Sequence, residues 1–339
     1  MAVREQERTQ KGLKWVARLA GTSPATVSRV INSRPGVRPE LRRVVEDVIR
    51  EHGLELNVAA RALKTSKTRT LAIIIPRSGS LVFANPYFTE ILGGITAVTE
   101  DAGYTLAVMT GATPNTLYEV NRNRSCDGVL FIGLRKNIPD PRSLRGATVP
   151  VVTIPKPGPR YKLPFVTVDD ETGTYEAVRY LVGRGHRRIA LVIGSPSSPF
   201  STTRVAGYRR ALKDAGLPYV PALVADGEFT DEGAHRVTLG LLGLSNPPTA
   251  ILAISDHMAT GVLSALQSRR LRVPSDVALV GFGNTPVSGL LSPSLTTVDE
   301  QLREVGAQAA SLLIRLAEGE AVEATQMVVP TKLVVRESA

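Results

Sequence analysis

Residues 15–32 read WVARLAGTSPATVSRVIN, and this stretch constrains the fold more than any other part of the chain. Gly21 stands where a first helix has to end, because glycine adopts a left-handed C-terminal conformation without steric cost. Ser23 is a good N-cap for a second helix. On that second helix, Val27 and Val30 recur at helical spacing. The pattern predicts two short helices joined by a tight turn.

The outward positions of the second helix carry small, hydroxylic or hydrogen-bonding side chains, where a solvated face would usually carry Glu and Lys. These positions are Ala25, Thr26, Ser28, Arg29 and Asn32. Such a face suits the DNA major groove, where bulk is excluded and where phosphates and base edges need donors. The alternative is a scaffold of two helices without a DNA-binding role.

Within this face, base readout is expected from Pro24, Ala25 and Arg29, at the start and middle of the helix. Phosphate contacts are expected from three hydroxyls, those of Ser23, Thr26 and Ser28.

The positive charge of the chain is concentrated near its N-terminus. Residues 1–69 hold 15 Lys and Arg against 7 Asp and Glu, whereas the remaining residues hold 26 against 24. Almost all of the net charge of +10 therefore falls on the first fifth of the sequence. A small basic head on a near-neutral body is the charge distribution expected of a nucleic-acid-binding protein.

The 15–32 string resembles the helix-turn-helix of the lac repressor/gal repressor family, whose pattern is V-A-x-x-A-G-V-S-x-x-T-V-S-R-V-(I/L)-N. The matching residues are Val16, Ala17, Ala20, Gly21, Ser23, Thr26, Val27, Ser28, Arg29, Val30, Ile31 and Asn32. The resemblance implies a helix-turn-helix domain over residues 12–56, with a third helix from Pro39 to His52. Residues 1–11, which are polar and charged, are expected to be disordered.

A short helix-prone segment, NVAARALK, follows at residues 57–64. It resembles the hinge helix of the same family, with Asn57, Ala60 and Leu63 at the matching positions. The resemblance implies that the segment folds only on operator DNA, enters the minor groove, and inserts Leu63 between base pairs. An ordinary linker helix is the alternative. Residues 57–69 are assigned to hinge and linker.

From Leu71 onward, short apolar strands alternate with helices, which indicates doubly wound parallel sheets. The expected strands are 71–75, 105–109, 128–132, 150–153, 166–168, 188–193, 222–225, 250–254 and 277–281. The expected helices include 86–102, 172–184, 203–215, 231–242 and 257–270. Nine strands fit two lobes better than one sheet, and a cleft between lobes is the natural ligand site.

The body, residues 70–339, also resembles the same family, and thereby the two-lobed fold of periplasmic sugar-binding proteins. The strings that carry this resemblance are NPYFTEILGGI, CDGVLFIG, VDDETGTYEAVRYLVGRGHRRIALVIG, RVAGYRRALKDAG, PTAILAISD, DVALVGFGN, LTTVD and KLVVRES. The resemblance implies effector binding in the cleft. The implied contacts are Asn85, Tyr87, Phe88, Asp169 or Asp170, Arg204, Phe229, Ser255 and Asp256.

Other roles for these cleft residues stay open. Arg204 could pair with an acid or cap a helix, although its place in a first helical turn favours a ligand role, because the helix dipole disfavours a cation there. Phe88 and Phe229 could belong to the core. Asp256 could be the N-cap of a helix beginning at His257.

One departure from the family pattern bears on the ligand. Many sugar- and purine-responsive members read G-F-D-D after a late strand, and the first Asp takes a ligand hydrogen bond. This chain has Gly283 and Asn284 in that place. A hexose effector is therefore in doubt, and an acidic or less hydroxylated ligand is favoured.

An enzyme is the competing class, since a doubly wound sheet alone fits many activities. The sequence contains no phosphate-binding G-x-x-x-x-G-K-[ST], no G-x-S-x-G and no H-E-x-x-H motif. Its four histidines and single cysteine are scattered, so no metal site, cofactor or catalytic residue is expected.

The expected protein is thus a DNA-binding transcriptional regulator, most simply a repressor, which binds a pseudo-palindromic operator as a homodimer. Its effector is expected to be a sugar or a related metabolite. The polar N-terminus and the lack of any apolar run approaching ~20 residues predict a cytoplasmic, nucleoid-associated protein without membrane contact.

Overall fold

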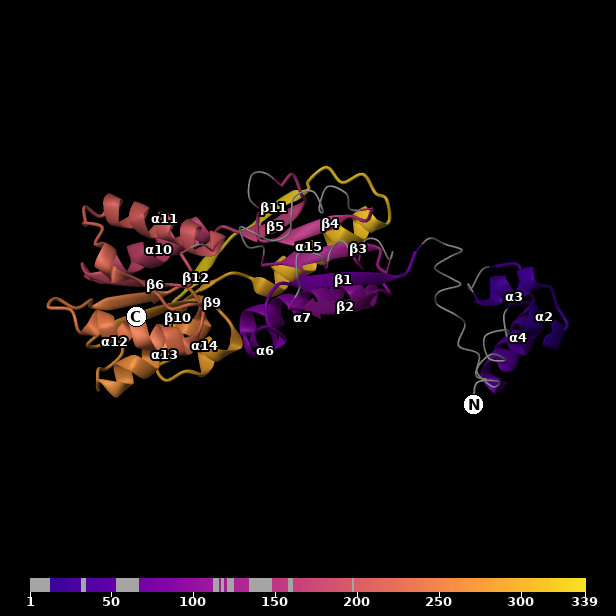
Figure 1. Ribbon diagram of the computed structural model, residues 1–339, viewed down its shortest axis with the longest axis horizontal. Helices are drawn as coiled ribbons and strands as arrows, with labels where there is room; N and C mark the ends of the chain where they lie inside the picture. The colour runs from indigo at the N-terminus through magenta and orange to yellow at the C-terminus, as the bar shows by residue number, and fades with distance from the viewer. Residues whose placement is uncertain are drawn as a thin grey trace. The chain divides into compact units, whose positions relative to one another are not determined.

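The computed structural model describes residues 13–31, 35–52, 67–111, 116, 119–120, 125–133, 148–157, 161–196 and 198–339. The chain divides into two compact units, residues 1–68 and residues 69–339, which we call the head and the body (Figure 1). Each is described by itself.

Within the described residues of the head lie the helices α2 (Leu13–Leu19), α3 (Pro24–Ile31) and α4 (Pro39–Glu51). They enclose a small core in which Val27 and Val45 are fully buried. Gly21 has a φ of +60°, so the predicted left-handed end of the first helix is confirmed. Ser23 Oγ accepts a hydrogen bond of 3.1 Å from the backbone N–H of Thr26, which confirms the predicted N-cap.

Several residues of the expected DNA-binding set lie outside the described residues. They are Asn32, Asn57, Ala60 and Leu63. The predicted hinge helix and the predicted disorder of residues 1–11 therefore stay predictions.

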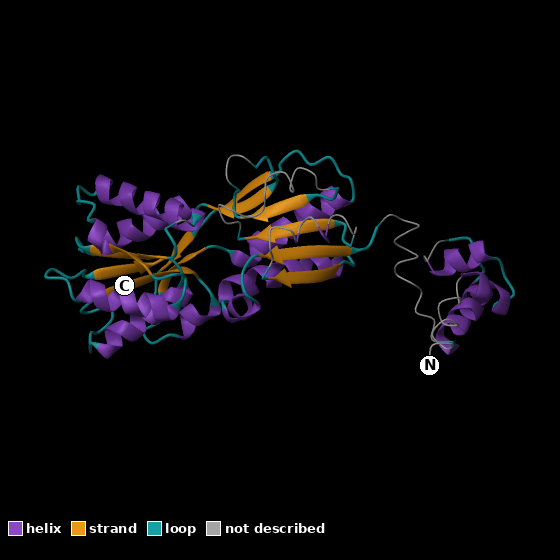
Figure 2. Cartoon of the chain, in the orientation of Figure 1, coloured by secondary structure: helices purple, strands orange, loops and turns teal. Residues whose placement is uncertain are grey.

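The body has two six-stranded sheets, each of which forms the centre of one lobe (Figures 1 and 2). The first has the order β11-β5-β4-β3-β1-β2 and the second the order β12-β10-β9-β8-β6-β7. The bounds in the first are β1 (Thr70–Ile75), β2 (Thr105–Thr110), β3 (Gly128–Ile132), β4 (Val151–Ile154), β5 (Phe165–Val168) and β11 (Gln326–Val329). Those in the second are β6 (Ile189–Ile193), β7 (Val224–Asp226), β8 (Ala250–Ala253), β9 (Ala278–Gly283), β10 (Thr296–Asp299) and β12 (Lys332–Val334).

All neighbouring strands are parallel except β12, which runs antiparallel to β10. The first lobe also has α6 (Gly79–Ala84), α7 (Pro86–Asp101) and α15 (Leu302–Ala317). The second has α10 (Asp170–Gly183), α11 (Pro199–Asp214), α12 (Asp231–Leu242), α13 (Asp256–Ser268), α14 (Pro286–Leu290) and a 3-10 turn at Pro221–Leu223. In this lobe α10 and α11 cover one face of the sheet, and α12 and α13 cover the other (Figures 1 and 2).

The helices α7 and α15 pack backbone to backbone at two glycines. A Cβ added to Gly94 would overlap the carbonyl oxygen of Arg303, and one added to Gly306 would overlap the carbonyl oxygen of Ile91. The contact therefore depends on the missing side chains, because a methyl group would force the helices apart.

The chain crosses between the lobes three times, after β5, after β10 and after β11. Because of the last two crossings, α15 and β11 return to the first lobe while β12 completes the second. Every predicted strand is present with ends within two residues, and the two-lobed doubly wound architecture is confirmed. Short strands such as β11 and β12 were not predicted, because they have only four and three residues and each begins with an exposed polar residue.

Candidate functional site

The exposed face of α3 carries the predicted DNA-reading side chains. Pro24, Ala25 and Arg29 are exposed, whereas Val27 and Val30 on the opposite face are buried in the head core. The helix therefore presents a surface of small side chains with one cation, and its apolar face anchors it to α2 and α4.

Two of the predicted phosphate-binding hydroxyls are engaged with each other. Ser23 Oγ and Thr26 Oγ1 are 2.9 Å apart, in addition to the N-cap hydrogen bond. At the other end of α3, Arg42 Nη1 donates a hydrogen bond of 3.3 Å to the carbonyl of Val30. The side chain of Arg42 thus satisfies an end carbonyl of α3.

A cleft lies between the two lobes of the body, at the carboxyl ends of their strands. Its empty space of about 820 Å³ includes open solvent at its mouth. Seven of the eight predicted contacts line it: Asn85, Tyr87, Phe88, Arg204, Phe229, Ser255 and Asp256. Asp169 does not line it. Its carboxylate instead accepts the backbone N–H of Thr172 at 3.1 Å and caps α10.

The wall from the first lobe is built by the start of α7. Asn85 Oδ1 accepts the N–H of Tyr87 at 3.0 Å and caps the helix, so its side chain is partly used in folding. The ring of Tyr87 packs edge-on against Phe88, and on its other side it reaches Phe200 of the second lobe at 6.0 Å. Phe88 belongs to the core of the first lobe and also lines the cleft. Burial raises the pKa of the Tyr87 hydroxyl well above its ordinary value.

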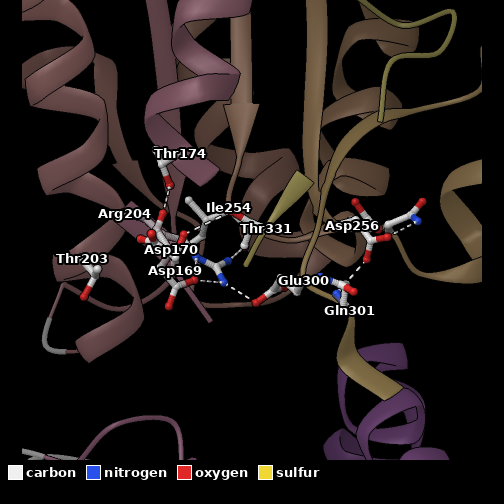
Figure 3. A network of polar contacts seen from close by, with 12 residues as sticks. Asp169, Asp170, Thr174, Thr203, Arg204, Ile254, Asp256, Glu300, Gln301 and Thr331 are labelled. Atoms are coloured by element: carbon white, nitrogen blue, oxygen red, sulfur yellow. Dashed lines mark hydrogen bonds and ion pairs between the residues drawn. The ribbon is translucent and has the colours of Figure 1, made fainter. Parts of the chain in front are cut away.

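Arg204 is the centre of a buried polar network (Figure 3). Its Nε donates to Asp170 Oδ1 at 2.8 Å, and Nη2 lies 2.6 Å from both Asp170 Oδ1 and Glu300 Oε1. Nη1 donates to the carbonyl oxygen of Ile254. The ring of Phe282 covers the guanidinium at 3.7 Å. Pairing with acids, the alternative considered from the sequence, is therefore present in the structure.

The two carboxylates of this network lie at different crossings of the chain between the lobes. Asp170 lies just after the crossing from β5, and Glu300 lies in the crossing from β10 to α15. Burial raises the pKa of both, that of Glu300 to about 7, although the charge of Arg204 acts in the opposite direction. Burial thus favours the neutral form of Glu300, whereas Arg204 favours its carboxylate.

Asp256 is a further buried carboxylate, and it lines the cleft. The cap of α13 is not Asp256, as the sequence suggested, but Ser255, whose Oγ accepts the N–H of Met258 at 3.1 Å. Asp256 itself accepts the N–H and the hydroxyl of Thr285 at 2.7 and 3.0 Å and the hydroxyl of Thr297 at 2.5 Å.

Phe229 is held in the cleft by a strained loop. Both Glu228 and Phe229 have a φ of +59°, a region that side chains other than glycine rarely adopt. The N–H of Glu228 donates to Asp226 Oδ1 at 2.8 Å, which tightens the turn. The ring of Phe229 lies directly on Gly194, where any side chain would overlap it. Phe229 thus contributes to the cleft wall and packs on the second-lobe core.

Comparisons with known proteins agree with this architecture. Residues 12–57 match the family model described as bacterial regulatory proteins, lacI family, and residues 178–339 match the periplasmic binding protein-like domain. The HTH-type transcriptional regulator CelR of Thermobifida fusca is 34% identical, with 98% of this chain and 99% of that protein covered. The chain belongs to the LacI family of transcriptional regulators.

Other LacI-family relatives include the HTH-type transcriptional repressor CytR of Escherichia coli K12, 32% identical over 100% of this chain and 98% of that protein. Among solved structures, a CelR–cellobiose complex has a TM-score of 0.75 at 32% identity, covering 96% of this chain and 99% of that one. A lac repressor dimer bound to operator and the anti-inducer ONPF has a TM-score of 0.81 at 26% identity, covering 95% and 97%.

Some residues of the LacI-family cleft were not predicted from the sequence. They are Arg77, Phe200, His257, Phe282 and Glu300, all of which line it. Glu300 directly follows β10, which is not among the strands predicted from the sequence. Its position at the carboxyl end of a strand, where ligand contacts are expected, could therefore not be recognised. In the described part of the chain, no helix is long and apolar enough to cross a membrane.

Proposed function

We propose that this LacI-family regulator represses transcription as a homodimer whose operator affinity depends on a small molecule bound in the body cleft. The observation that carries the proposal is the position of the cleft. Its walls come from both lobes, and Glu300 and Leu302 on its lining lie at the crossing from β10 to α15. A ligand held there contacts both lobes at once, so binding favours one relative position of the lobes.

The proposed DNA contacts are those of the α3 face, with Arg29 as the main reader of a base edge. An arginine can donate two hydrogen bonds to the O6 and N7 atoms of guanine, which distinguishes guanine from other bases. Two-fold symmetry of a dimer requires a pseudo-palindromic operator, with one half-site per head. The hinge segment, with Leu63 as minor-groove wedge, is part of the same proposal.

We further propose that the body senses and does not catalyse, and that the protein acts in the cytoplasm, where its DNA is. The relatives are named as regulators. The charged groups of the cleft are also bound to one another. Arg204 is held by Asp170, Glu300 and a backbone carbonyl, and Asp256 is held by two threonines. Side chains fixed in this way suit a binding site.

The operator can be found by sequencing genomic fragments selected by the purified full-length protein. Arg29→Ala should then weaken operator binding by roughly 1–3 kcal/mol and relax its sequence preference. Arg43→Ala is the matched control, because Arg43 is an exposed arginine of α4 in the same head. If the Arg29 variant kept the wild-type ratio of specific to scrambled DNA binding, the proposed base contact would be wrong.

The effector role is tested by measuring operator affinity with compounds suggested by the genes beside the operator. Phe229→Ala should leave operator affinity unchanged in the absence of effector and should raise the effector concentration required. Leu290→Ala is the control, since Leu290 is 83% exposed and does not line the cleft. Equal effector responses in both variants would place the sensing site elsewhere.

A further inference from the structure

The charges buried in the cleft are unbalanced. Asp256 and Glu300 line it, Asp170 contacts Arg204, and each of the three is at most 5% exposed. Arg204 is the one fully buried cation beside them among the described residues. Asp256 has hydroxyl and backbone partners but no ion pair among these residues. Among the buried groups, negative charges therefore outnumber positive ones, whereas Arg77 on the cleft lining and Arg336 near Asp256 are half-buried cations.

An anionic ligand does not fit this cleft. It would face the carboxylates of Asp256 and Glu300, and it could recruit Arg204 only by competing with Asp170, Glu300 and the carbonyl of Ile254. The acidic effector favoured by the absence of an aspartate at position 283 is therefore not supported by the charges of the cleft.

Glu300 has one oxygen left for a ligand. Its Oε1 binds Arg204, whereas Oε2 accepts no hydrogen bond from any described residue, although Glu300 is only 2% exposed and lines the cleft. Gly283 lies beside this oxygen. A Cβ at Gly283 would be 3.6 Å from Glu300 Oε2 and 3.4 Å from Asp256 Oδ2. The glycine thus leaves both carboxylates accessible to one small donor group.

Aromatic rings line the same cleft. Tyr87, Phe200, Phe229 and Phe282 come from both lobes. The faces of aromatic rings carry negative electrostatic potential and attract cations, and a cation removed from water gains more from them than one in solvent. Phe282 and Phe200 already pack against the Arg204 guanidinium, so Tyr87 and Phe229 are the rings left to join the carboxylates in favouring a ligand cation.

We propose that the effector is a compact polar molecule carrying a protonated amine, and that Glu300 is the residue that selects it, with the ammonium group held between Glu300 and Asp256 over Gly283. This inference rests on the proposed effector role of the cleft. It assigns Glu300 to binding specificity, since its free oxygen accepts the ammonium proton while its other oxygen holds Arg204 in place.

The test compares ligands of matched shape and different charge on the full-length protein. One set is glucosamine, glucose and glucuronate, and the other is putrescine, butane-1,4-diol and succinate. Thermal stabilisation and calorimetry should show at least one amine binding ten-fold or more tightly than its neutral and acidic counterparts. Stabilisation by neither amine, or equal or tighter binding of a neutral or acidic counterpart, overturns the proposal.

Glu300→Gln keeps the size of the side chain and removes its charge, so it should abolish the preference for the amine by ten-fold or more. Glu323→Gln, at an exposed position outside the cleft, should not change it. Circular dichroism and urea unfolding verify that both variants fold. If Glu300→Gln folds and retains the amine preference, Glu300 is not the selecting residue.

Amine binding should also depend on pH. The groups that face Glu300 are Arg204 of α11, Asp170 at the start of α10, Asp256 of α13 and Tyr87 of α7, and His257 lines the same cleft. Because the pKa of Glu300 is about 7, the deprotonated fraction that binds an ammonium group rises about tenfold between pH 6 and pH 8. Putrescine affinity should rise accordingly in the wild type and stay flat in the Glu300→Gln variant.

The outcome for this inference is separable from that for the proposed function. If a neutral or acidic compound binds the cleft and changes operator affinity, the effector role stands and the amine does not. If an amine binds through Glu300 and operator affinity is unchanged, the ligand class stands and the effector role does not.

Discussion

Replacing Arg204 by methionine removes the cation that compensates two buried carboxylates. Breaking a buried ion pair from one side generally costs about 3–5 kcal/mol, because a charge stays buried without a partner. At pH 8, Arg204→Met should therefore lower the free energy of unfolding of the body by about 3–5 kcal/mol. The loss concerns both Asp170 and Glu300, which contact the same guanidinium.

The same substitution should cost less in mild acid. The pKa of both carboxyls is already raised by burial, that of Glu300 to about 7, and loss of Arg204 raises both further. At pH 5.5 the carboxyls can take up protons, and only the cost of neutral, unsatisfied polar groups is left, roughly 1–3 kcal/mol. The pH dependence of the loss distinguishes a charge effect from a packing effect.

Urea unfolding at both pH values measures these losses. Far-UV circular dichroism follows the body, while the fluorescence of Trp15, the single tryptophan, follows the head and should be unchanged. Arg315→Met is the control, because it removes an exposed ion pair of 2.8 Å with Glu320, for which at most about 1 kcal/mol is expected. A loss below 1 kcal/mol for Arg204→Met, or the same loss at both pH values, would refute the reasoning.

Three further predictions concern other parts of the chain. The pKa of Glu300 is about 7 in the folded state and 4.5 ordinarily, so the folded protein binds an extra proton between these pH values. The stability of the wild type relative to Glu300→Gln should therefore fall between pH 4.5 and 7 and level off above. Parallel pH profiles of the two proteins would contradict this. Gly94→Ala should lower the free energy of unfolding by about 1–3 kcal/mol or more, because the new Cβ overlaps the backbone of Arg303. Gly240→Ala is the control, because a Cβ at Gly240 contacts nothing. Equal urea midpoints for the two variants would exclude the close packing of α7 on α15. Leu63→Ala should weaken specific DNA binding more than non-specific binding and reduce the DNA bend in circular-permutation gel shifts; an unchanged bend would leave residues 57–64 as a linker helix.

Local patterns predicted most of the architecture. The turn at Gly21, the cap at Ser23 and the nine apolar strands depend on residues close together in the sequence, and all are present. The strands β11 and β12 could not be recognised in this way, because each is short and pairs with a strand far away in the sequence, β5 and β10 respectively.

The cleft was predicted in part. The residues at strand ends and helix starts gathered as expected, with the exception of Asp169, whose carboxylate serves as a helix cap. The partners of Arg204 could not be specified, because Glu300 lies 96 positions away and meets Arg204 only through the crossing between lobes. From the sequence, Gly283 indicated only that the aspartate usual in the family at this position is absent. The structure instead shows the buried carboxylate of Glu300 beside that glycine.

The threefold crossing of the chain has a consequence for biosynthesis. The outer strands β11 and β12, at residues 326–334, are the last elements of both sheets to leave the ribosome, although β5 and β10 are made well before them. Until then β5 and β10 are unpaired edges, and unpaired edges are sites at which nascent chains associate. Both lobes therefore reach their native sheets within the same few residues of synthesis, and a ribosome that stalls before residue 326 leaves two incomplete lobes.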